Sequence, residues 1–157
     1  MSFVSSVPAP ARSPGNDVDV RGPRFAAWVT SAVLVTALLT ANGWVVAAQA
    51  VVFTIGAFAG IRRSPYAVLF QTLVAPRLGP VVEREPEAPL RTAQSIGLLF
   101  AVVGAAGYLL GVPVLGAIAT GFALVAALLN AATGFCLGCE LHLLVRRAAT
   151  RSTRAAV

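Results

Sequence analysis

No charged side chain interrupts the 48-residue stretch TAQSIGLLFAVVGAAGYLLGVPVLGAIATGFALVAALLNAATGFCLGC, which runs from Thr92 to Cys139. A membrane span needs about 20 apolar residues, so this stretch is too long for a single span. Gly111-Val112-Pro113 divides it, because glycine and proline favour turns. The stretch therefore predicts two spans joined by a turn, one over about 91–110 and the other over about 114–138.

A second charge-free stretch lies between Arg24 and Arg62 and is 37 residues long. As one helix it would be about 55 Å long, whereas the hydrocarbon core of a bilayer is about 30 Å thick. Asn42-Gly43 supplies a turn, because both residues tolerate positive φ. This stretch predicts two further spans, over about 24–41 and about 44–61.

The composition also indicates a membrane protein. Apolar residues make up 57% of the chain and charged residues 11%, with a mean hydropathy of +0.81, whereas soluble domains average about 25% charged residues. The net charge of +6 comes from twelve arginines, all outside the two charge-free stretches. They flank apolar runs, which disfavours nucleic acid as a partner. The positive-inside rule places both termini and the central loop in the cytoplasm, with the protein in the plasma (inner) membrane.

These features predict an all-α, polytopic membrane protein with four transmembrane helices arranged as two hairpins. Residues 1–23 are rich in Ser, Pro and Ala, which predicts a disordered cytoplasmic tail. The transmembrane domain is expected over 24–147, with a cytoplasmic loop at 62–90. Residues 148–157 are expected to form a second cytoplasmic tail.

The central loop contains a pattern of its own. Ser64-Pro65 is typical of a helix start, and Pro76 follows the apolar residues that end at Val74. The segment is too short to span a bilayer. It predicts a short helix at the cytoplasmic interface.

Cys136 and Cys139 form a CxxC pair that is followed by Glu140 and His142. On one helix, positions three residues apart share a face at a distance compatible with a disulfide. Two interpretations are open. The cysteines are a reactive thiol pair, with Glu140 as proton acceptor, or they are small packing residues.

The electrostatics of the pair depend on where the last span ends. Near the C-terminal end of a helix over 114–138, the helix dipole opposes a thiolate, and so does Glu140. If the helix instead breaks at Gly134 and a new helix starts near Cys136, this argument reverses.

Other chemistry is less favoured. Cys136, Cys139 and His142 spread over about 120° of a straight helix, so they converge poorly on one metal ion. No Walker motif, G-x-S-x-G, H-E-x-x-H or GxGxxG occurs, and neither a metal nor a cofactor is predicted. The few polar groups within the predicted spans include three amides, Gln49, Gln94 and Asn130. Amides in membrane helices commonly bridge one helix to another.

Four blocks of sequence carry a family resemblance: Asp19–Ala26 (DVRGPRFA), Ser64–Tyr66 (SPY), Pro76–Pro80 (PRLGP) and Asn130–Glu140 (NAATGFCLGCE). Together they resemble a family of bacterial integral membrane proteins, common in actinobacteria, that is called domain of unknown function 4395. The resemblance covers about 19–147, and His142 stands where tyrosine is usual. Members are reported beside sulfurtransferase and thioredoxin-like genes, which implies thiol or sulfur handling by association.

Three functional hypotheses follow. In the first, Cys136 and Cys139 exchange electrons or sulfane sulfur with a cytoplasmic thioredoxin-like or sulfurtransferase partner. In the second, the protein is a small homo-oligomeric transporter or channel for a sulfur compound. In the third, it is a non-catalytic accessory subunit that lies in the lipid bilayer. Whether the protein is an enzyme stays open. The predicted spans contain no charged residue, which counts against an ion-coupled transporter.

Overall fold

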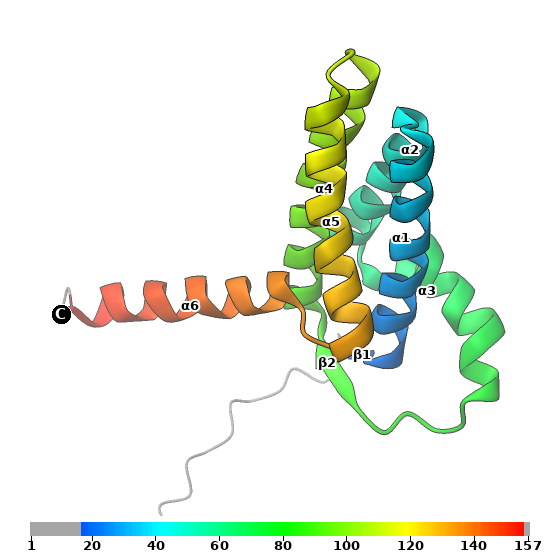
Figure 1. Ribbon diagram of the computed structural model, residues 1–157. Helices are drawn as coiled ribbons and strands as arrows, with labels where there is room; N and C mark the ends of the chain where they lie inside the picture. The colour runs from blue at the N-terminus through cyan, green and yellow to red at the C-terminus, as the bar shows by residue number, and fades with distance from the viewer. Residues whose placement is uncertain (1–16, 156–157) are drawn as a thin grey trace, which may run out of the picture.

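Four apolar helices form an antiparallel bundle in the computed structural model, which describes residues 17–155 (Figure 1). They are α1 (Arg21–Thr40), α2 (Gly43–Thr54), α4 (Glu87–Leu109) and α5 (Pro113–Thr133). Helix α2 packs on α4, α4 on α5 and α5 on α1, and α1 contacts α2 in turn. The helices therefore close into a ring, in agreement with the prediction of an all-α fold.

Both hairpin turns lie where the sequence predicts them. Helix α5 begins at Pro113, after Gly111 with φ 80°. In the first turn the left-handed residue is Ala41, with φ 48°, rather than Asn42 or Gly43. Asn42 is instead extended, and its side-chain oxygen accepts the Trp44 N–H at 2.9 Å, so it caps α2.

Three of the four bundle helices are long and apolar enough to cross a membrane, namely α1, α4 and α5. Helix α2 continues as a π-helical segment, η1 (Ile55–Ala59), and together they form a shorter apolar helix over Gly43–Ala59. Gly60, with φ 103°, ends it. The predicted span at 44–61 is therefore present as a helix of 17 residues, about 25 Å long, and four complete spans remain a proposal.

The central loop contains the short helix that the sequence predicts. Helix α3 (Pro65–Leu69) continues as η3 (Phe70–Val74) and η4 (Ala75–Arg77). Ser64 holds the N-cap position, although its side chain makes no capping hydrogen bond. A short segment η2 (Ile61–Arg63) connects α2 and η1 to α3.

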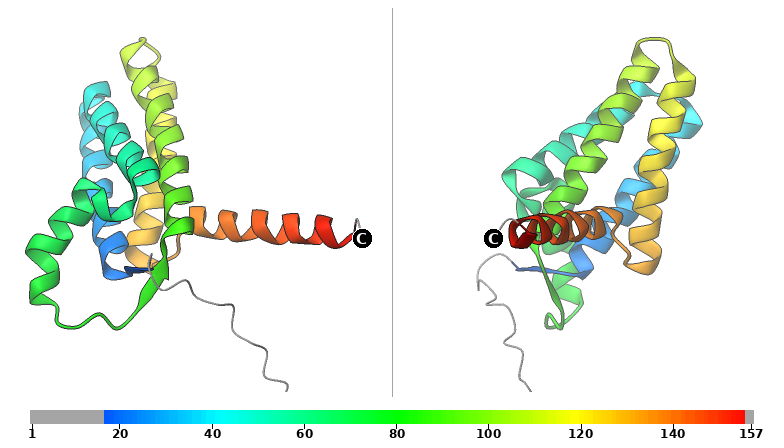
Figure 2. Two further views of the ribbon diagram at one scale, coloured as in Figure 1. Left: turned by 180° about the vertical axis from the view of Figure 1, so that it is seen from behind. Right: turned by 90° about the vertical axis from the view of Figure 1, so that its left-hand side faces the viewer.

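The end of the last bundle helix differs from the prediction of a span over 114–138. Helix α5 ends at Thr133, because Gly134 adopts the left-handed conformation with φ 74° and its N–H bonds to the Asn130 carbonyl at 2.9 Å. The Thr133 hydroxyl then accepts the Phe135 N–H at 3.1 Å. A separate helix, α6 (Leu137–Ala155), follows and runs sideways from the base of the bundle (Figure 2).

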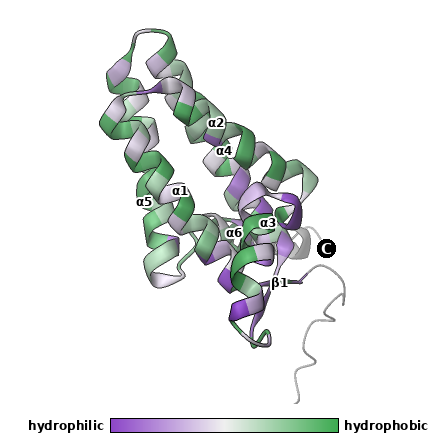
Figure 3. Cartoon of the chain, turned by 90° about the vertical axis from the view of Figure 1, so that its right-hand side faces the viewer, coloured by the Kyte–Doolittle hydropathy of each residue, from purple (hydrophilic) through white to green (hydrophobic). Residues whose placement is uncertain are grey.

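Two segments expected to be tails carry structure. Strand β1 (Asp17–Asp19) pairs antiparallel with β2 (Arg84–Pro86), and α1 begins at Arg21, so residues 17–23 of the predicted disordered tail are folded; residues 1–16 lie outside the described residues. Helix α6 likewise covers most of the predicted tail 148–157. Hydrophilic residues gather around β1, α6 and the end of α3, whereas the bundle helices are largely hydrophobic (Figure 3).

Candidate functional site

Cys136 lies at the N-terminal end of α6. Its carbonyl accepts the backbone N–H groups of Cys139 and Glu140, both at 3.0 Å, so Cys136 occupies the N-cap position. The predicted placement at the C-terminal end of a span is therefore wrong, because Gly134 ends α5 before the cysteines. The positive end of the α6 dipole faces Cys136. It therefore favours the thiolate, whereas the C-terminal end of a helix would oppose it.

The two thiols have opposite acidities. The pKa of Cys136 is lowered to about 7, first because the Cys139 thiol donates a hydrogen bond to its sulfur, and also because the N–H groups of Cys139 and Gly138 point at it. Burial and the carboxylate of Glu85 act in the opposite direction. The pKa of Cys139 is raised, because its proton is held in the bond to Cys136 and because the thiol is partly buried. Cys136 is therefore the more acidic thiol of the pair, and Cys139 holds its proton more tightly.

The first turn of α6 is held tightly against α4. A Cβ atom on Gly138 would lie 2.4 Å from the Ala93 Cα, so only glycine allows this approach. The hydroxyl of Thr92 lies 2.9 Å from Nδ1 of His142. His142 thus connects α6 to α4. These contacts fix the position of the cysteine pair relative to the bundle.

The surroundings of the cysteines also differ. Cys139 packs against a small apolar cluster of Val18, Ile61 and Leu90. Glu140 is exposed in the first turn of α6, where its charge helps to raise the pKa of Cys139. Within residues 17–155 the Glu140 carboxylate makes no hydrogen bond to either thiol. Its predicted role as proton acceptor therefore stays a prediction.

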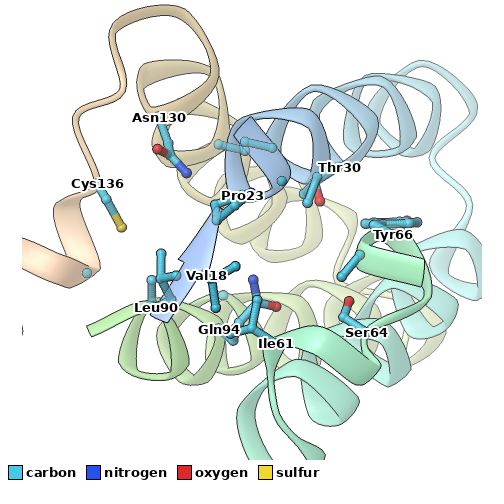
Figure 4. Close-up of a pocket in the computed structure, with 18 of the residues that line it drawn as sticks. Val18, Pro23, Thr30, Ile61, Ser64, Tyr66, Leu90, Gln94, Asn130 and Cys136 are labelled. Carbon is cyan, nitrogen blue, oxygen red and sulfur yellow. The ribbon is translucent and has the colours of Figure 1, made fainter. Parts of the chain in front are cut away.

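A cavity of about 540 Å³ opens inside the bundle beside the Cys136 sulfur (Figure 4). Side chains from α1, α3, α4, α5 and α6 line it, and most of them are apolar. The uncharged polar groups in its wall include Thr30, Tyr66, Gln94, Asn130 and Ser64. The site thus combines one acidified thiol with a largely apolar chamber.

One wall of the cavity is fixed by a polar chain across three helices. The Tyr66 hydroxyl donates to Oε1 of Gln49 at 2.6 Å, and Nε2 of Gln49 donates to the Thr30 hydroxyl at 3.5 Å. The expectation that Gln49 bridges helices is thereby confirmed. Neither Thr30 nor the cavity itself was predicted from the sequence. Tyr66, however, lies in one of the four blocks that carry the family resemblance.

Metal binding has no geometric support in the described part of the chain. Among residues 17–155, no group of three or more His, Cys, Asp or Glu side chains is arranged to hold a metal ion. Both cysteines are free thiols.

Comparison with known proteins identifies the family. The family model described as Domain of unknown function (DUF4395) matches residues 18–147, which is most of the chain. The chain belongs to this family, as its sequence resemblance indicated. No curated protein and no solved structure matches it.

Proposed function

We propose that this family member is a plasma-membrane protein whose Cys136/Cys139 pair exchanges electrons or sulfane sulfur with a cytoplasmic thioredoxin-like protein or sulfurtransferase. The observation that carries the proposal is the position of Cys136, whose carbonyl caps the start of α6 while its side chain lines the cavity; the pKa of this thiol is lowered to about 7, first by hydrogen bonding with Cys139. Such a sulfur is an anion at neutral pH for a substantial fraction of molecules. Apolar helices long enough to cross a bilayer support the membrane location.

The two cysteines have separate roles in this proposal. The Cys136 thiolate attacks one sulfur of a partner disulfide, forms a mixed disulfide and releases the other partner sulfur as a thiolate. Cys139 then loses its proton, for which the adjacent Glu140 is the proposed acceptor, and attacks the Cys136 sulfur to release the reduced partner. With a persulfide donor, Cys136 attacks the outer sulfur, which it keeps as a persulfide, and the donor leaves as a thiolate.

Single cysteine variants test the assignment. In membranes from cells that express Cys139→Ser, Cys136 should accumulate a mixed disulfide or a persulfide, because the resolving thiol is missing. Cys136→Ser should trap at most a tenth as much, because the remaining thiol is partly buried and lies near the Glu85 and Glu140 carboxylates, which disfavour its thiolate. The double variant is the control for unrelated disulfides. Thiols that stay reduced and unmodified in wild type and in both single variants, under mild oxidant, would exclude the proposal.

The proposed orientation places the four helices with both termini in the cytoplasm, because all arginines lie outside the charge-free stretches. In a background without native cysteines, Asn42→Cys and Pro113→Cys should react with an impermeant thiol reagent added to intact cells. Ser152→Cys should react only after the membrane is opened. Labelling of Ser152→Cys from outside would reverse the orientation.

The cavity favours a second candidate function, transport of a small sulfur compound. A chamber of about 540 Å³ within apolar helices could hold a solute during passage. Uptake of a labelled neutral sulfur compound, such as thiourea, into vesicles containing the purified protein tests this alternative. Uptake that is unchanged in the cysteine double variant would favour transport over thiol exchange, and uptake equal to that of empty vesicles would exclude it.

A further inference from the structure

Two side-chain amides face the same cavity as the Cys136 sulfur. Asn130, from the last turn of α5, and Gln94, from the first half of α4, both line it together with Cys136, and all three are drawn in Figure 4. Within residues 17–155 neither amide side chain has a hydrogen-bond partner. Gln94 is also held in place, because its side chain lies directly over Gly56. An amide without a partner in an apolar chamber favours a ligand that accepts hydrogen bonds.

The charges around the cavity favour a neutral ligand. Its wall includes two carboxylates, Asp17 and Asp19, and two guanidinium groups, Arg62 and Arg84. Asp19 is already paired with Arg21 at 2.8 Å, and Arg62 donates to the Asp17 carbonyl. The balanced wall offers no excess positive charge to an anion such as thiosulfate, which would lose its hydration on entry.

The size and lining of the cavity further limit the kinds of ligand that it can bind. Its volume of about 540 Å³ falls within the ~300–1,000 Å³ that is usual for small-molecule sites. Apolar side chains, many of them from α1, α4 and α5, form most of the wall, as suits a molecule that dissolves in lipid. A phospholipid acyl chain would fill such a space but would leave both amides without acceptors. A ring that carries carbonyl oxygens would satisfy them.

We propose that this cavity binds a lipid-soluble quinone, with its carbonyl oxygens accepting hydrogen bonds from Asn130 and Gln94, and that the bound quinone oxidises the Cys136/Cys139 pair. Electron transfer rests on the thiol exchange proposed above, whereas quinone binding rests on the cavity alone. The two thiols lose two electrons and two protons and form one S–S bond. The quinone takes up both electrons and both protons and leaves as the quinol. A cytoplasmic dithiol partner then reduces the disulfide by the reverse of the exchange described above and is itself oxidised, so electrons pass from the partner thiols to the membrane quinone pool.

Oxidation of the purified full-length protein in lipid nanodiscs tests the electron transfer. The probe is decylubiquinone, whose fully substituted ring avoids direct addition of a thiol. We expect it to oxidise the reduced wild-type pair, seen as loss of maleimide labelling together with formation of quinol. Gln94→Leu and Asn130→Leu should each slow this reaction at least tenfold. Ser95→Leu, beside Gln94 on the exposed side of α4, should not.

The soluble oxidant diamide separates the quinone proposal from the thiol function. If the variants are folded, diamide should close their disulfide at the wild-type rate. Closure by diamide but not by decylubiquinone would overturn the quinone proposal and leave thiol exchange intact. Equal oxidation of all variants by the quinone would overturn the assigned site. Thiols inert to both oxidants would overturn thiol exchange and the electron step together.

Binding is measured separately in the variant Cys136→Ala/Cys139→Ala, which has no redox chemistry. Decylubiquinone should raise the Tm of this variant, and the addition of Asn130→Leu should remove the increase. An unchanged Tm over a concentration range that oxidises the wild-type protein would overturn the cavity as the quinone site. A persistent increase in the Asn130→Leu background would overturn the role of that amide.

Discussion

The two halves of the bundle are packed in different ways. In the turn half, next to the hairpin turns, glycines let α4 and α5 touch: a Cβ on Gly107 would lie 2.5 Å from the Gly116 nitrogen, and one on Gly104 would lie 2.7 Å from the Thr120 hydroxyl. In the base half, next to β1, β2 and α6, side chains of the helices line the cavity. Backbone contact excludes a ligand from the turn half, whereas the base half leaves space beside the Cys136 thiol.

The difference shows how a helical bundle rich in small residues can keep a cavity at one end. In the base half, Gly138 brings α6 close to the backbone of α4, while polar contacts hold the ends of the bundle helices. Arg91 donates to the carbonyls of Ala57 and Phe58 at the end of the α2–η1 helix, at 2.8 and 3.0 Å. The Glu87 carboxylate accepts the Ile61 N–H at 2.9 Å. These groups fix the helix ends without filling the space between the helices.

The largest expected effect is the loss of backbone contact in the turn half. Gly107→Ala places a methyl group 2.5 Å from the backbone of α5, so the helices must separate. We expect a loss of about 3 kcal/mol in unfolding free energy in detergent. Gly121→Ala, on α5, is the matched control because a Cβ there meets no atom within 4 Å. Equal stability of the two variants would show that the turn half is not close-packed.

A smaller effect is expected where a carboxylate holds the base half. Glu87→Ala leaves the N–H of the buried residue Ile61 without its acceptor, which should cost about 2 kcal/mol. Glu87→Gln keeps an acceptor oxygen and should recover at least half of the loss. Denaturation of both variants in the same detergent measures the difference. A loss that Gln does not reduce would show that the charge, rather than the acceptor, stabilises the η2 segment.

The reactivity of Cys136 tests the electrostatics of the base half. Its alkylation rate should rise with pH through a midpoint of about 7, because only the thiolate reacts. Cys139→Ala removes the largest cause of that low pKa, and the rate at pH 7 should fall about tenfold as the midpoint moves upward. The pH profile is measured by maleimide labelling and mass spectrometry. A midpoint that stays near 7 in the variant would assign the low pKa to the α6 backbone alone.

The smallest effect is expected at the surface of the base half. Asp19 pairs with Arg21 and accepts its backbone N–H, and the pKa of Asp19 is lowered first by the hydrogen bond from the Arg21 side chain. The ionised carboxylate therefore stabilises the fold above about pH 4, and this contribution disappears as the pH falls through the lowered pKa. Asp19→Asn should lower the Tm by about 2 °C or less at pH 7. The difference from wild type should vanish at low pH; a difference that persists there would assign the effect to packing.

Much of the helical framework could be predicted because it depends on local properties. The absence of charge, the positions of Gly111 and Pro113, and the Ser64-Pro65 pair each act within a few residues. The predicted end of the last span lies beyond the observed end at Thr133. Apolar residues continue past Gly134, and hydropathy carries no information about a residue in the left-handed conformation. The paired strands β1 and β2 were missed because two three-residue strands about 65 residues apart leave no periodic signal.

The sequence by itself determined a helical membrane protein, its hairpin turns and the presence of a CxxC pair. Only the tertiary structure decided where that pair lies and which groups surround it. The break at Gly134 turned Cys136 from a residue near a helix end into an N-cap, where N–H groups face its sulfur. The packing of Cys139 against Val18 and Leu90, and the opening of the cavity beside Cys136, arise between segments far apart in the chain. Charge and hydropathy are properties of single residues, whereas thiol acidity and cavity shape depend on which distant groups meet.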